Sequence, residues 1–107
     1  MLSLAACEGN EVSYTIVEED IKSEGGKSSV RLYTDEATEE NIENIITELR
    51  QNDFFGSGSI HAWIHEPPTE GLPEYGALVA TAKYAHTENG LAQVGVDETT
   101  TVYVEFE

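Results

Sequence analysis

Short stretches of alternating apolar and polar residues run through most of the chain, and each predicts a strand with one buried face. The first two stretches are residues 12–17 and 30–33, and the glycine-containing segment 22–27 between them predicts a turn. We therefore expect these two strands to form a hairpin, with the acidic residues 18–20 solvated near its tip. Three further strands are predicted at residues 60–65, 78–85 and 102–106.

One segment has the period of a helix instead. Four large apolar residues recur at i, i+3, i+4 and i+7 and form one stripe, namely Ile42, Ile45, Ile46 and Leu49. Thr38 is suited to cap the start of this helix, and the acidic residues 39–40 follow at the positive end of its dipole. Full burial of the stripe would contribute roughly 6–12 kcal/mol, so it should pack on a sheet.

The segments between these elements predict loops and turns. Residues 67–73 contain three prolines, which lack the backbone donor that a strand interior needs. Residues 87–90 have the composition of a tight turn, and residues 91–96 predict an irregular segment or a short sixth strand. The predicted fold class is α+β: an antiparallel sheet of five to six strands with one amphipathic helix packed on one face. We expect residues 11–107 to form this single domain and residues 1–10 to form an N-terminal tail or the remnant of a lipobox.

The charge balance restricts the partners of the chain. It contains 21 Asp and Glu residues against 5 Lys and Arg residues, a formal net charge of −16. Such a surface repels phosphate backbones and anionic lipid head groups. We therefore expect no nucleic-acid partner, and we favour a protein partner with a basic surface. The alternatives are a cytoplasmic acidic inhibitor that imitates DNA, a halophile-adapted small domain, and a charge that only keeps the surface solvated.

The residues Leu4, Ala5, Ala6 and Cys7 resemble a bacterial lipobox, in which the signal is cut before the cysteine and the thiol carries lipid. The resemblance implies lipidation of Cys7 and a location in the cell envelope outside the cytoplasm, with membrane contact only through this anchor. A secretory signal has a basic start and an apolar stretch of about 7–15 residues. Only six residues, none of them Lys or Arg, precede Cys7. The true start therefore lies upstream of Met1, or the match is accidental.

No residue pattern indicates catalysis, a cofactor or a metal. Cys7 is the single cysteine, so it has no partner for an internal disulfide. His61 and His65 would lie about 13 Å apart on one strand, too far to share a zinc ion. Residues 56–59 lack the setting of a serine nucleophile, and residues 25–28 join two strands instead of entering a helix as a phosphate loop does. We expect a protein that is not an enzyme.

Aromatic residues gather on one side of the predicted sheet. His61, Trp63 and His65 alternate with the apolar residues of their strand, so they face away from the helix. Tyr33 and Tyr103 take the same position on their own strands. Aromatic side chains that are exposed together are typical of a binding face. The alternative is that loops or a partner chain cover this side.

Residues 13–21, the helix, residues 80–86 and Gly90 together resemble a group of small bacterial secreted or phage-associated, lipoprotein-like proteins. The resemblance covers about two-thirds of the chain and implies no catalytic residues. Together with Cys7 and the aromatic face, it favours a non-catalytic binding module outside the cytoplasm.

Overall fold

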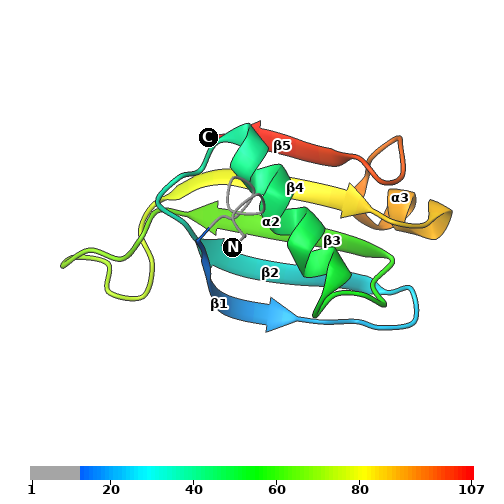
Figure 1. The fold of residues 1–107 in the computed structure, drawn as a ribbon, viewed down its shortest axis with the longest axis horizontal. Helices are drawn as coiled ribbons and strands as arrows, with labels where there is room; N and C mark the ends of the chain where they lie inside the picture. Colours follow the sequence, from blue (N-terminus) through cyan, green and yellow to red (C-terminus); the bar gives the residue numbers. More distant parts are fainter. Residues whose placement is uncertain (1–12) are drawn as a thin grey trace, which may run out of the picture.

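Residues 13–107, which the computed structural model describes, build a five-stranded sheet with one helix lying across a face of it (Figure 1). The predicted α+β class is confirmed. The elements are β1 (Thr15–Asp20), β2 (Lys27–Tyr33), α2 (Glu39–Gln51), β3 (Ser59–His65), β4 (Leu78–Ala85), α3 (Glu88–Val94) and β5 (Val102–Phe106).

The strands lie in the sheet in the same order as in the chain. Strands β1 and β2 form the predicted antiparallel hairpin, and β3, β4 and β5 are also antiparallel to their neighbours. The prediction of an entirely antiparallel sheet is wrong for one pair, because β2 and β3 are parallel. The physical reason is the connection: α2 carries the chain back across the sheet, so β3 starts at the same end as β2.

Helix α2 forms as its sequence predicts. The Thr38 hydroxyl accepts a hydrogen bond from the Asn41 backbone N–H at 3.2 Å, which caps the first turn. Glu39 and Glu40 lie at the positive end of the helix dipole, and Arg50 lies in the last turn. The apolar stripe is buried along its whole length: Ile42, Ile45, Ile46 and Leu49.

The core lies between this stripe and the inner face of the sheet. Its sheet side combines large residues of β2 and β3 with alanines of β3 and β4, whose small side chains leave room for the isoleucines of α2. Phe54, in the turn after the helix, closes the core and is completely buried, whereas its neighbour Phe55 is exposed. The sheet residues of the core are Val30, Leu32, Ile60, Ala62, Ile64, Ala80 and Ala82.

A second helix, α3, replaces the predicted turn at residues 87–90 and the irregular segment or strand at 91–96. The Thr87 hydroxyl accepts from the Gly90 N–H at 3.1 Å and caps the helix, so the Asn-Gly pair lies in a first turn instead of a hairpin. Gly95 ends the helix in the left-handed conformation, with φ of 75°. These prediction errors arise because residues 87–90 suit a cap as well as a turn.

Helix α3 is held tightly at one end of the sheet. The Ser59 hydroxyl donates to the side-chain oxygen of Gln93 at 2.6 Å, and the Gln93 amide donates to the Gly25 carbonyl at 3.1 Å. A Cβ atom on Gly90 would overlap the carbonyl oxygen of Gly58, at the start of β3. Glycine at position 90 therefore sets how closely the helix approaches the strand.

We expect Gly90→Ala to lower the free energy of unfolding by about 1–3 kcal/mol, the usual range for overpacking. The sign of this change is informative, because alanine is the better helix former by about 1 kcal/mol and would stabilise the helix if there were room for its Cβ atom. Gly71→Ala is the control, because nothing lies within 4 Å of its added Cβ. Urea unfolding of both variants measures the difference. Equal stability of the Gly90 variant and the original chain would contradict the close approach.

Candidate functional site

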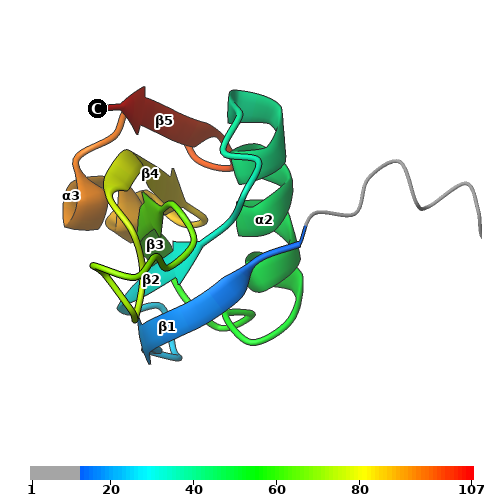
Figure 2. The same ribbon diagram turned by 90° about the vertical axis from the view of Figure 1, so that its left-hand side faces the viewer.

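The face of the sheet opposite α2 is called the open face below. Figure 2 shows α2 on one side of the strands, with α3 and the loop after β3 on the other. Strand pairing places two rows of side chains across this face. The first row is Glu18, Arg31, Trp63, Thr81 and Glu105, and the second is Asp20, Ser29, His61, Lys83 and Tyr103.

An irregularity in β1 brings a carboxylate onto the open face. The pairing of β1 with β2 shifts between Ile16 and Glu18. Ile16 lies opposite the core residue Leu32, and the shift then turns Glu18 to lie opposite Arg31. The Arg31 Nε donates to a Glu18 carboxylate oxygen at 3.3 Å. Simple alternation would have placed Glu18 on the other face.

Arg31 lies between two aromatic rings. Its guanidinium carbon is 5.3 Å from the ring centre of Trp63 and 5.3 Å from that of Tyr75. Such cation–π contacts contribute about 0.5–2 kcal/mol each, depending on exposure. Sequence reasoning missed both Arg31 and Tyr75. Tyr75 follows the proline-containing loop, and no local pattern shows that this loop folds back.

His65 is buried, with 4% of its surface exposed, and is not available as a contact surface. The loop after β3 returns through backbone hydrogen bonds of Glu66 with Gly76 and Ala77 and lays Tyr75 edge-on against the His65 ring at 4.3 Å. Arg31 donates to Nε2 of His65 at 2.6 Å, and Nδ1 lies 2.8 Å from the Gly76 carbonyl oxygen. Because arginine only donates and a carbonyl only accepts, these two contacts fit the His65 tautomer that has its proton on Nδ1.

The other four residues of the predicted binding face also lie on the open face, and each is partly exposed. The His61 and Trp63 rings stack at 4.3 Å with an angle of 21°. Tyr33 lies opposite His65, toward one end of the sheet. Tyr103 is two strands away from His61, and its hydroxyl accepts from the Glu98 N–H at 3.1 Å.

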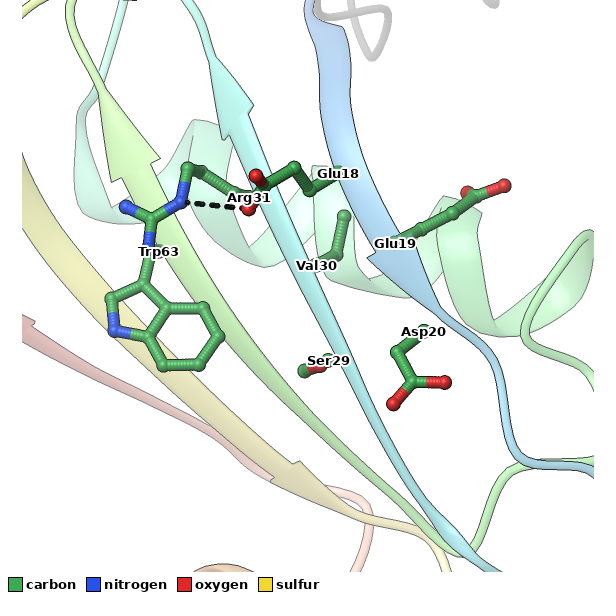
Figure 3. A pocket seen from close by; sticks show the side chains of 7 residues that line it. All are labelled: Glu18, Glu19, Asp20, Ser29, Val30, Arg31 and Trp63. Atoms are coloured by element: carbon green, nitrogen blue, oxygen red, sulfur yellow. Dashed lines mark hydrogen bonds and ion pairs between the residues drawn. The ribbon is translucent and has the colours of Figure 1, made fainter.

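A groove opens beside Trp63 at the β1 side of the open face, with a volume of about 230 Å³. Figure 3 shows Glu18 and Arg31 turned toward each other, Glu19 pointing away from Trp63, and Asp20 near the end of β1. The groove therefore has the Trp63 indole on one side and the acidic end of β1 on the other, where Glu18 and Asp20 lie on the open face and Glu19 lies at the sheet edge. We call it the Trp63 groove; its lining is Glu18, Glu19, Asp20, Ser29, Val30, Arg31 and Trp63.

Within residues 13–107, no three His, Cys, Asp or Glu side chains converge as metal ligands would. No helix of this part of the chain is long and apolar enough to cross a bilayer. The predicted lipidation site, Cys7, lies outside the described residues. Comparisons with models of known protein families, with curated proteins and with solved structures find no match.

Burial lowers the pKa of His61, and the nearby charges of Lys27 and Lys83 lower it further. We expect an NMR titration to place its pKa below the ordinary value, and Lys27→Met to raise it. Lys22→Met is the control, since Lys22 is paired with Asp20. In the unfolded chain His61 regains its ordinary pKa, so this residue makes the fold less stable as the pH falls below that value. A His61 pKa unchanged by Lys27→Met would contradict this electrostatic environment.

Proposed function

We propose that the chain is a non-catalytic binding module that holds a basic segment of a protein partner on its open face. The observation that carries this proposal is the Trp63 groove, where an indole faces the carboxylates of β1. An ammonium or guanidinium group gains from both walls, because a carboxylate attracts it and an indole ring offers a cation–π contact. The groove therefore suits a lysine or arginine side chain.

Arg31 shows the same chemistry within the chain. It combines a carboxylate, Glu18, with two aromatic rings. A cation of the partner in the neighbouring groove would meet the same kinds of group, supplied by Glu19, Asp20 and Trp63. Because Glu18 is already engaged by Arg31, Asp20 on the open face and Glu19 at the sheet edge are the carboxylates that we assign to the partner. Asp20 also pairs with Lys22 at 3.3 Å, but both side chains are largely exposed, so a cation of the partner can replace Lys22 there.

The net charge of −16 supports a basic partner at longer range. A field of one sign steers oppositely charged proteins toward the surface and raises their association rate. At about 0.15 M salt this field decays over about 8 Å, so short-range contacts at the groove must supply the specificity. Trp63 is suited to this role, since tryptophan is enriched among the residues that dominate binding energy.

We further propose that the module acts in the cell envelope, anchored by lipid on Cys7. The support is the resemblance of Leu4, Ala5, Ala6 and Cys7 to a lipobox. The anchor would leave the open face directed at partners outside the cytoplasm.

Mass spectrometry of the protein purified from its native cells tests the anchor. We expect a thioether-linked diacylglycerol on Cys7, and loss of lipid labelling in Cys7→Ser. An unmodified Cys7 in the native protein would rule the anchor out and leave the groove proposal standing.

A peptide of alternating lysine and serine tests the groove, with an alternating glutamate and serine peptide as the charge control. Trp63 is the single tryptophan, so its fluorescence reports binding at this face. We expect Glu19→Gln combined with Asp20→Asn to weaken binding of the basic peptide about three- to tenfold, since exposed charge pairs contribute about 0.2–1 kcal/mol each.

The matched control is Glu39→Gln combined with Glu40→Gln, which removes the same charge from the first turn of α2. This control should change affinity less than about twofold, because its carboxylates do not line the groove. An equal loss in both double variants would mean that only net charge matters. A larger loss in the α2 variant would move the site to the helix and favour the inhibitor that imitates DNA.

A further inference from the structure

A second cavity lies on the α2 side of the sheet, away from the open face, and is called the Arg50 pocket. It is the space between the last turn of α2 and the strands β4 and β5, and its volume is about 340 Å³. That volume is at the lower end of the range of about 300–1,000 Å³ for small-molecule sites. The residues that matter for its chemistry are Arg50, Phe55, Tyr84, His86, Thr100 and Val102.

The charge of this pocket is opposite to that of the rest of the surface. No carboxylate lines it, although the chain has 21 acidic residues. Each of four other surface cavities within residues 13–107 includes at least one Asp or Glu. The Arg50 pocket instead holds one of only 5 basic side chains. This local reversal of charge suits an anion.

Arg50 has an unused donor at this site. Its Nε atom is buried and has no hydrogen-bond partner among residues 13–107. Nor does its guanidinium form an ion pair within this part of the chain; it lies 5.1 Å from the ring centre of Phe55. A buried donor without an acceptor is costly, and a guanidinium fork matches a carboxylate through two parallel hydrogen bonds. A bound carboxylate would supply the missing acceptor.

The remaining walls suit an apolar body. The Phe55 side chain is largely exposed, with 69% of its surface accessible, and Val102 lies across the pocket from β5. The Tyr84 hydroxyl and the His86 Nδ1 are 3.0 Å apart and form a polar pair at the rim. Burial lowers the pKa of His86, and the charge of Arg50 lowers it further, which favours the neutral imidazole.

The backbone at Thr100 is also unusual. This β-branched residue has φ of 58°, a left-handed conformation that such residues rarely adopt. Its N–H donates to the Ala85 carbonyl at 2.7 Å, which ties it to the end of β4. Backbone conformations of this kind concentrate at binding sites. Thr100 thus holds one wall of the pocket in place.

We propose that the Arg50 pocket binds a small aromatic carboxylate, with its carboxylate on the Arg50 guanidinium and its ring against Phe55 and Val102. A single negative charge is preferred. The net charge of −16 repels every anion, and the repulsion grows with the charge of the ligand. A phosphate monoester, which carries about −1.5 to −2 at pH 7, is therefore disfavoured relative to a carboxylate.

The test is an NMR titration of the full chain with sodium benzoate, benzamide and phenyl phosphate at about 0.15 M salt, where screening leaves short-range contacts intact. We expect benzoate to shift the Arg50 Nε–H signal and the Thr100 and Val102 methyl signals in a saturable way. Benzamide, which has the same shape and no charge, should produce no saturable shift. Phenyl phosphate should bind more weakly than benzoate.

Two variants distinguish a specific contact with the Arg50 guanidinium from a general effect of positive charge. Arg50→Gln should weaken benzoate binding more than about tenfold, because it removes a charge-assisted fork. Lys83→Gln removes the same charge from the open face and should change affinity less than about twofold. Should Arg50→Gln fail to fold, Phe55→Ala remains informative: this exposed ring is dispensable for the core, and its loss should weaken binding about threefold or more.

Three results would overturn the proposal: no saturable shift with benzoate, equal shifts with benzamide, or benzoate binding that persists unchanged in Arg50→Gln. Tighter binding of phenyl phosphate would overturn the assignment to a carboxylate. Trp63 lies on the opposite side of the sheet, so its fluorescence should stay constant during the titration. The outcome is therefore independent of whether a basic peptide binds the open face.

Discussion

The packing of the apolar stripe of α2 on the inner face of the sheet decides most of this structure. Ile42, Ile45, Ile46 and Leu49 meet a surface in which alanines of β3 and β4 make space for them. The same packing brings the chain back between β2 and β3, and so makes that strand pair parallel. It also determines which side chains remain on the open face. The Trp63 groove and the Arg50 pocket lie on opposite sides of the sheet because α2 covers only one of its faces.

The elements with a strong period could be predicted from the sequence, and the contacts between distant segments could not. Alternation in β3 located the strand, and the spacing of the isoleucines located α2. The sequence could not show that β2 and β3 are parallel. An alternating apolar–polar pattern is the same whether the neighbouring strand runs parallel or antiparallel. Helix α3 is short and begins with residues that also suit a turn, so the local sequence does not distinguish the two. The close packing of Gly90 against Gly58, just before β3, favours the helix.

The same holds for the candidate sites: residues within periodic strands could be placed from the sequence, and contacts between distant segments could not. Alternation correctly placed His61, Trp63, Tyr33 and Tyr103 on the face away from α2. It could not show that the loop after β3 buries His65 beneath Tyr75, since that contact depends on how the loop returns. In the sequence, Arg50 is only a cation that follows Leu49 at the end of the predicted helix. Its pocket is assembled from α2, β4, β5 and three connecting segments, which are far apart in the sequence, so no local pattern could predict it.

The acidic end of β1 has a consequence for self-association. This strand is an edge of the sheet, and an edge presents unpaired backbone groups that another copy can join. Two copies that approached along β1 would bring two sets of three carboxylates together, from Glu18, Glu19 and Asp20. Their repulsion opposes fibre-like stacking of strands. The other edge, β5, carries Glu105 as its one acidic residue, so it is the less protected of the two. The residues that we assign to a cationic partner thus also oppose the pairing of identical chains along β1.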